Sequence, residues 1–153
     1  MDLEKYMRAA VKLASEAAGA GEVPVGCVIT DENDNVIATG RNRREERRSA
    51  TAHAEMEAID AACAATGDRR LTGCTLFVTL EPCPMCAGAI IASRVSRVVF
   101  GARDENTGAC GSVINLFEER FGHKPAVFGG ILETECSEII SGFFEKLRIK
   151  AGE

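Results

Sequence analysis

Segments with the periodicity of strands alternate with segments with the periodicity of helices, and this alternation limits what the chain can fold into. Five short apolar or β-branched runs predict strands at residues 23–30, 36–39, 74–80, 95–100 and 128–132. Helices are predicted around them, at residues 2–18, 52–65, 84–93, 112–117 and 135–148. Strands that alternate with helices in this way form an α/β fold with helices on both faces of one sheet.

The first two predicted strands are separated by a polar turn cluster (D-E-N-D-N, residues 31–35), which indicates a hairpin. Hairpin strands run antiparallel, whereas strands joined through a helix run parallel, so the sheet should be mixed. A chain of 153 residues also suits one domain. We therefore expect residues 1–153 to form a single three-layer α/β/α domain with a mixed, roughly five-stranded central sheet.

The composition argues against membrane proteins and disulfide-rich secreted proteins. No run reaches the roughly 18 apolar residues that a membrane helix needs. Residues 1–8 carry charges of both signs and lack the apolar core of a secretion signal, so we expect a cytoplasmic protein. The cysteines number seven, and an odd number without a signal also argues against a disulfide framework.

The net charge of −5 does not by itself indicate a nucleic-acid partner. One segment differs locally, because residues 41–48 (R-N-R-R-E-E-R-R) contain five arginines and two glutamates. Charge alone favours a solvated loop there, and a phosphate-binding patch is the alternative.

Two short segments carry candidate chemistry: residues 51–55 (T-A-H-A-E) and residues 81–86 (E-P-C-P-M-C). Cys83 and Cys86 lie three positions apart at a predicted helix start, so they can face one ion, and the helix N-terminus favours their thiolates. A Cys-x-x-Cys pair alone indicates either a redox dithiol or half a zinc site. His53 favours zinc, because a catalytic zinc site has three protein ligands and leaves the fourth position to water.

Glu55 follows His53 by two positions, which correspond to about 200° around a regular helix. The two side chains would then point apart, unless His53 lies in the irregular first turn. We favour that second arrangement, because a carboxylate beside the water can act as a proton acceptor. The simpler interpretation of Glu55 is an ordinary solvated helix residue.

The complete pattern, His-x-Glu followed by Pro-Cys-x-x-Cys, is the known signature of zinc nucleobase deaminases, of which tRNA adenosine deaminase is a standard example. The chain resembles the bacterial tRNA-specific adenosine deaminase family of the cytidine deaminase-like superfamily over nearly its whole length. The matching segments are residues 21–26 (G-E-V-P-V-G), 51–55, 79–89 (T-L-E-P-C-P-M-C-A-G-A), 98–102 (V-V-F-G-A) and 143–148 (F-F-E-K-L-R).

The resemblance implies a cytidine deaminase-like fold and hydrolytic conversion of adenosine to inosine at the wobble position of a tRNA anticodon. It implies one zinc ion per chain, held by His53, Cys83 and Cys86, with Glu55 as the proton shuttle. It further implies that Asn42 binds the extruded base, that Asp104 shapes the pocket beside the neighbouring nucleotides, and that Arg148 and the arginines of residues 41–48 contact phosphate. The expected partners are a tRNA anticodon stem-loop and a second copy of the chain in a homodimer.

The sequence departs from the family pattern in three places, all outside the zinc motif. Ser49 and Ala50 stand where the family often has Asp-Pro, Gly122 stands where an Asn precedes His123, and the lysine-rich tail of some members is missing.

Three other functions remain open at this point. A deaminase of a free base or nucleoside would share the metal site and differ in its pocket. A redox dithiol would use the cysteine pair but gives no reason for His-x-Glu. A zinc-stabilised interaction module would need a fourth protein ligand, for which His123 or Cys110 could serve.

Overall fold

The structure, a computed structural model, describes residues 1–152 and is built on one five-stranded sheet. The strands are β1 (Gly26–Thr30), β2 (Val36–Arg41), β3 (Thr75–Leu80), β4 (Arg97–Ala102) and β5 (Ala126–Phe128), in the order β2-β1-β3-β4-β5. Strand β1 is antiparallel to both β2 and β3, whereas β3, β4 and β5 are parallel. The predicted mixed sheet is confirmed.

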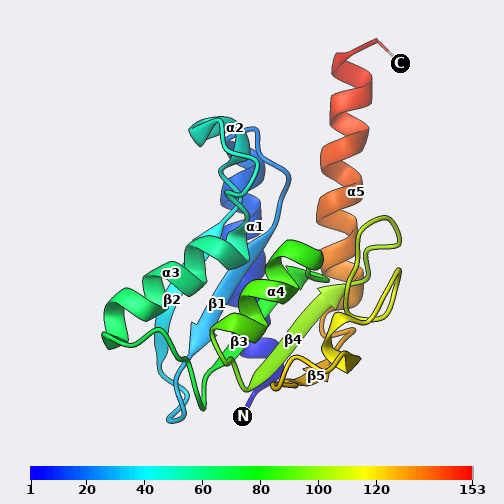
Figure 1. Ribbon diagram of the computed structural model, residues 1–153. Coiled ribbons are helices and arrows are strands. Elements are labelled where there is room, and N and C mark those ends of the chain that lie inside the picture. Colours follow the sequence, from blue (N-terminus) through cyan, green and yellow to red (C-terminus); the bar gives the residue numbers. More distant parts are fainter. Residues whose placement is uncertain (153) are drawn as a thin grey trace.

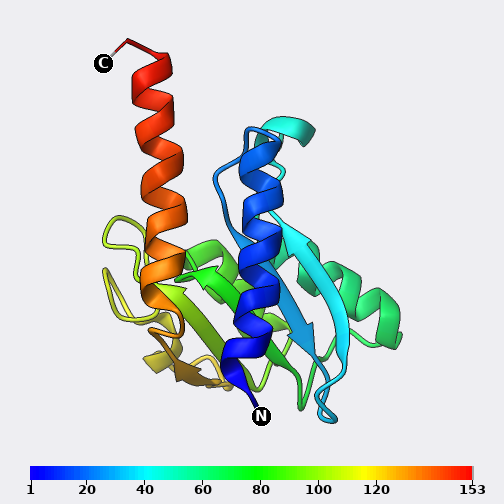
Figure 2. The same ribbon diagram turned by 180° about the vertical axis from the view of Figure 1, so that it is seen from behind.

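Helices cover both faces of this sheet (Figures 1 and 2). They are α1 (Leu3–Gly19), α2 (Arg44–Arg47), α3 (Ala54–Thr66), α4 (Pro84–Ala92) and α5 (Glu133–Lys150), with a 3-10 turn η1 (Leu116–Glu118). The core between α3, α4 and the sheet is separate from the core that α1 and the start of α5 form on the other face. The three-layer α/β/α architecture is therefore as predicted. No helix within residues 1–152 combines the length and apolar character needed to cross a bilayer.

Two glycines of the hairpin allow the helices to pack closely on its strands. A Cβ atom at Gly26 of β1 would overlap the Ala10 carbonyl oxygen of α1. A Cβ atom at Gly40 of β2 would likewise overlap the Ala54 carbonyl oxygen of α3. Because α1 and α3 lie on opposite faces, each glycine fixes the distance between the hairpin and one layer of helices.

Three predicted elements differ from the structure. The arginine-rich segment contains the short helix α2, and the helix predicted at residues 112–117 is only the 3-10 turn η1. The strand predicted at residues 128–132 is instead β5, which ends at Phe128. Gly129 and Gly130 follow it, and the ring of Phe100 occupies the space that a side chain at Gly129 would need. The chain therefore turns there and enters α5.

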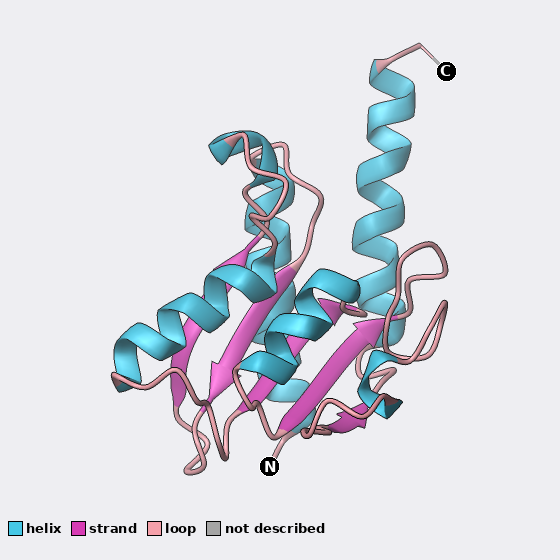
Figure 3. Cartoon of the chain, viewed as in Figure 1, coloured by secondary structure: helices cyan, strands magenta, loops and turns pink. Residues whose placement is uncertain are grey.

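The carboxyl ends of β2, β3 and β4 meet at one edge of the sheet, because these three strands share a direction. The first turns of α3 and α4 begin near the same edge, and the second half of α5 extends beyond it (Figure 3). Ligands of open α/β sheets bind at such an edge. Asn42, Glu81 and Arg103 are the residues that directly follow these three strands.

Candidate active site

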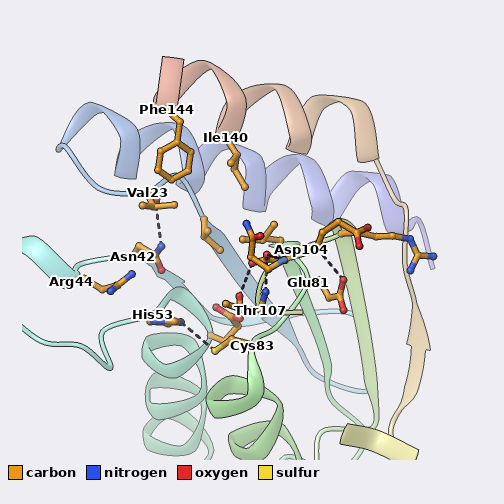
Figure 4. A pocket seen from close by; sticks show the side chains of 16 residues that line it. Val23, Asn42, Arg44, His53, Glu81, Cys83, Asp104, Thr107, Ile140 and Phe144 are labelled. Carbon is orange, nitrogen blue, oxygen red and sulfur yellow. Dashed lines mark hydrogen bonds between the residues drawn. The ribbon is translucent and has the colours of Figure 1, made fainter. Parts of the chain in front are cut away.

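A cavity of about 520 Å³ opens at this edge (Figure 4). Its floor includes His53, Glu55 and Cys83, from the starts of α3 and α4. Ile140 and Phe144 of α5 face that floor from the other side. The remaining lining comes from residues 23–25 and 42–44 on one side and from 80–81 and 103–107 on the other: Val23, Val25, Asn42, Arg44, Leu80, Glu81, Arg103, Asp104, Glu105, Asn106 and Thr107.

His53, Cys83 and Cys86 form a group whose ligand atoms all lie within 4.8 Å of one another. The His53 Nδ1 atom lies 3.8 Å from Cys83 Sγ and 3.5 Å from Cys86 Sγ. Tetrahedral zinc with ordinary bond lengths separates a sulfur from a nitrogen ligand by about 3.6 Å. The donor set and its spacing therefore fit one zinc ion.

Local structure explains this convergence. His53 and Cys83 are the N-cap residues of α3 and α4, and both have extended backbone conformations. Cys86 lies one turn into α4 and is fully buried, whereas His53 and Cys83 are half-buried and line the cavity. The group is thus enclosed on the protein side and open toward the cavity, as a catalytic zinc site requires.

Cys83 and Cys86 differ in acidity, because the two thiols are hydrogen-bonded to each other. Hydrogen bonds from Cys86 and, secondarily, His53 lower the pKa of the Cys83 thiol to about 4, against the effect of burial. The same bond to Cys83, together with burial, raises the pKa of Cys86. This shift favours the thiolate of Cys83, the form in which cysteine binds metals.

Glu55 lies in the first turn of α3, with only 4% of its surface exposed, and lines the same cavity. The extended conformation of His53, just outside the helix, lets the two side chains reach one cavity despite their spacing. Burial raises the pKa of the Glu55 carboxyl to about 7. A carboxyl group with that pKa can both accept and donate a proton near neutral pH.

Asn42 is buried beside the cavity, and both polar atoms of its side chain are hydrogen-bonded to backbone. Its Nδ2 donates to the Val23 carbonyl at 3.1 Å, and its Oδ1 accepts from the Ala54 N–H at 2.9 Å. A carboxamide has a second N–H and a second lone pair. Asn42 therefore has capacity to bind a ligand while it holds the start of α3 in place.

Asp104 lies in the cavity wall formed by residues 103–107, and its carboxylate is used within that wall. It accepts hydrogen bonds from the N–H groups of Asn106 (3.0 Å) and Thr107 (3.1 Å), and from the Thr107 hydroxyl (2.8 Å). Its direct effect in the structure is to order the loop.

The arginines of residues 41–48 fall into two groups. Arg41 and Arg43 bind Glu46 at 3.1 and 2.8 Å, and Arg43 and Arg47 bind Glu57 at 2.8 and 3.6 Å. Arg44, in contrast, lines the cavity. The segment is therefore only partly a free cationic surface.

Two buried carboxylates that hold the site were not identified from sequence. Glu22, 1% exposed, accepts the N–H groups of Glu45 (3.1 Å) and Glu46 (2.8 Å) and so anchors α2. Glu81, 2% exposed, binds the segment around Cys110. Burial opposes ionisation of Glu81, but its hydrogen bonds outweigh burial and lower the pKa of the carboxyl. Glu81 belongs to the quoted E-P-C motif, yet nothing in that motif reveals its partners.

The two residues considered as fourth ligands lie outside the metal-binding group formed by residues 1–152. The His123 ring instead lies 2.7 Å from the Val95 carbonyl oxygen through its Nε2 atom. Cys110 is buried, and its backbone N–H donates to Glu81. This geometry gives no support to a closed structural zinc site.

Comparison with known proteins agrees with the geometry. A family model for the cytidine and deoxycytidylate deaminase zinc-binding region matches residues 1–102. A tRNA-specific adenosine deaminase of Bacillus subtilis (strain 168) is 52% identical over 148 residues, 96% of this chain and 91% of that protein. The matched regions include His53, Glu55, Cys83 and Cys86.

Two solved structures share the fold. One, from a study of A-to-I editing by tRNA:A34 deaminases at the wobble position of transfer RNA, has a TM-score of 0.85 and 42% identity, covering 88% of this chain and 98% of that one. A guanine deaminase from Nitrosomonas europaea has a TM-score of 0.81 and 26% identity, covering 92% of this chain and 83% of that one. The predicted cytidine deaminase-like fold is confirmed.

Proposed function

The chain belongs to the zinc-dependent cytidine and deoxycytidylate deaminase family, within its tRNA-specific adenosine deaminases, and from this premise we propose that it converts adenosine to inosine at the wobble position of a tRNA anticodon. The observation that carries the proposal is the meeting of His53, Cys83 and Cys86 beside the buried Glu55 in one open cavity. We also propose that the protein acts in the cytoplasm, because its proposed substrate is a tRNA.

The reaction is a hydrolysis in which the C6–N6 bond of adenine breaks and a C6–O bond forms, giving inosine and ammonia. His53, Cys83 and Cys86 would hold the zinc ion, which when bound would supply an acidified water near neutral pH. Glu55 accepts a proton from the attacking water and delivers it to N1 of the ring. Glu55 then takes the proton of the new C6–OH group and gives it to N6, so that N6 leaves as ammonia and a C6=O group remains. This double role suits a carboxyl with a pKa of about 7.

The base must leave the anticodon stack to reach this cavity, and loop nucleotides do so more easily than paired ones. We assign Asn42 to hydrogen bonding with the extruded purine, because its side chain has one N–H and one lone pair to spare. We assign Asp104 to the shape of the wall beside the neighbouring nucleotides, because its carboxylate orders residues 104–107.

We further propose that the protein is a homodimer. Helix α4 (P-M-C-A-G-A-I-I-A) has no charged residue, although Pro84 and Ala92 are exposed. Val113 and Ile114 are also exposed, at 54% and 46%. Light scattering should give twice the chain mass, and Ala92→Arg should shift the protein toward the monomer. A monomeric wild-type protein would contradict the assignment.

The test of the function compares substrates. The zinc-loaded protein is incubated with an anticodon stem-loop carrying a wobble adenosine, with the same stem-loop carrying adenosine at a neighbouring position, and with free guanine, cytosine, adenosine and cytidine. We expect inosine, which sequencing reads as guanosine, only at the wobble position. Turnover of a free base or nucleoside with an unchanged stem-loop would instead establish the alternative, a free-base or free-nucleoside deaminase.

A further inference from the structure

Glu81 is a carboxylate that the proposed mechanism does not use, although it is only 2% exposed. No lysine or arginine within residues 1–152 forms an ion pair with it. Its Oε1 accepts from the Asp104 N–H at 3.1 Å and from the Ser112 hydroxyl, and its Oε2 accepts from the N–H groups of Cys110 (2.9 Å) and Ser112 (3.1 Å). A buried charge without a counter-ion persists only when hydrogen bonds satisfy it in this way.

All these donors lie within residues 103–112, the segment that follows β4. Five consecutive residues at its start, 103–107, line the active-site cavity. The segment fits Glu81 closely, because a Cβ atom at Gly108 would overlap both the Glu81 carboxylate and the Asp104 carbonyl oxygen. Glu81 therefore acts as the internal support of one cavity wall.

Glu81 is also joined to the metal-binding turn, the residues between β3 and α4 that lead to Cys83. Glu81 directly follows β3 and precedes Cys83 by two residues, and its own N–H donates to the Ala102 carbonyl at 2.8 Å. The Pro82 carbonyl in turn accepts from the Ala109 N–H at 2.8 Å. Segment 103–112 is thus held by Glu81 and Pro82, the two residues that directly precede Cys83.

From this arrangement we propose that Glu81 is a positioning residue, whose carboxylate sets the distance between the 103–112 wall and the metal-binding turn and so fixes where the tRNA nucleotide is bound. The inference rests on the proposed function. Glu81 acts through Asp104 and its neighbours, so its loss should affect substrate binding more than the chemical step. A purely structural residue would instead lower the amount of active protein and leave KM unchanged.

The test is Glu81→Gln, which keeps the size of the side chain but presents an NH₂ group where the carboxylate accepts hydrogen bonds. We expect KM for the stem-loop to rise at least about tenfold, with kcat changed much less, because misplaced substrate contacts are costly. Zinc should remain at one ion per chain. Hydrogen exchange should accelerate at the amides of Asp104, Cys110 and Ser112 and stay unchanged in α3.

Glu119→Gln is the matched control, because Glu119 is exposed and close in sequence but outside the cavity lining. It should resemble wild type in every measurement. Ser112→Ala removes only the hydroxyl donor, so it should raise KM and accelerate amide hydrogen exchange by a smaller factor than Glu81→Gln. It replaces Glu81→Gln as the test if that variant does not fold.

Unchanged exchange and an unchanged KM in a folded Glu81→Gln protein overturn the inference. A fall in kcat that matches lost zinc, with KM unchanged, also overturns it, because Glu81 would then only support the metal site. A wild-type protein that does not act on the stem-loop refutes the proposed function instead, so the two failures are distinguishable.

Discussion

The Oδ1 atom of Asn42 accepts a hydrogen bond of 2.9 Å from the backbone N–H of Ala54, the first residue of α3. Ala54 lies between His53 and Glu55, so this bond joins the end of β2 to the start of α3, where both of these residues line the cavity. The Nδ2 atom of Asn42 donates a second hydrogen bond to the Val23 carbonyl oxygen. Asn42 therefore holds the start of α3 in place and also lines the cavity.

Asn42→Ala removes both bonds and leaves a buried N–H without its acceptor. We expect the free energy of unfolding to fall by about 1–3 kcal/mol, measured by urea denaturation. Activity measured at urea concentrations well below the unfolding midpoint should also fall, because the purine loses its hydrogen bonds to the Asn42 side chain. The control is Asn33→Ala in the exposed β1–β2 turn, which should change little. Normal kcat/KM in folded Asn42→Ala would exclude Asn42 from substrate binding.

Glu55→Gln tests the proton shuttle. The amide keeps the size of the side chain but cannot accept and return a proton, so the rate should fall at least about a hundredfold. The zinc content should remain one ion per chain, because Glu55 lies outside the metal-binding group. Asp60→Asn, on the exposed side of the same helix, should keep the wild-type rate. Turnover of Glu55→Gln within a few fold of wild type would remove the residue from the mechanism.

Gly26→Ala tests the packing of α1 on the hairpin. The added Cβ meets the Ala10 carbonyl oxygen, so the helix must move and stability should fall by about 1–3 kcal/mol. Gly142→Ala is the opposite case, because Gly142 lies within α5 with open space around it. That change should stabilise the protein by about 1 kcal/mol. Relative to wild type, the midpoint of thermal unfolding should therefore fall in Gly26→Ala and rise in Gly142→Ala. Equal midpoints in the two variants would contradict the packing argument.

Arg44→Gln tests whether Arg44, of the arginines in residues 41–48, contacts RNA. Arg44 is exposed and lines the cavity, whereas Arg43 is bound by Glu46 and Glu57. We expect weaker stem-loop binding and a salt dependence reduced by about one phosphate contact. Arg94→Gln, exposed beyond α4 and outside the cavity lining, is the control. Binding curves for Arg44→Gln and Arg94→Gln that coincide at every salt concentration would argue against this contact.

The metal-binding group could be predicted from sequence because its geometry is local. Cys83 and Cys86 are fixed by one helix start, and His53 and Glu55 by another. Two helix starts at the carboxyl edge of one sheet meet because β2 and β3 run in the same direction. The sequence leaves open whether His53 lies in the regular helix or in its irregular first turn, and in the structure it is the N-cap residue, outside the regular helix.

The supports of the cavity could not be predicted in the same way. Glu81 binds backbone N–H groups 23 to 31 residues away, and Glu22 binds those of α2, 23 and 24 residues away. Backbone donors have no residue type, so no sequence pattern marks them. The position of Ile140 and Phe144 over the cavity also depends on how α5 packs, which the periodicity of α5 does not define.

X-ray absorption at the zinc edge of the purified protein shows whether His53, Cys83 and Cys86 bind one zinc ion together, because it counts the sulfur and lighter atoms bound to the metal. With one zinc per chain, we expect two sulfurs at about 2.3 Å and two lighter ligands at about 2.0–2.1 Å. Cys83 and Cys86 supply the sulfurs, and His53 and solvent supply the others. Cys83→Ala should lose zinc, whereas Cys63→Ala should keep it. A third sulfur at the metal would contradict this set of ligands, and an active protein without zinc would contradict a zinc-dependent reaction.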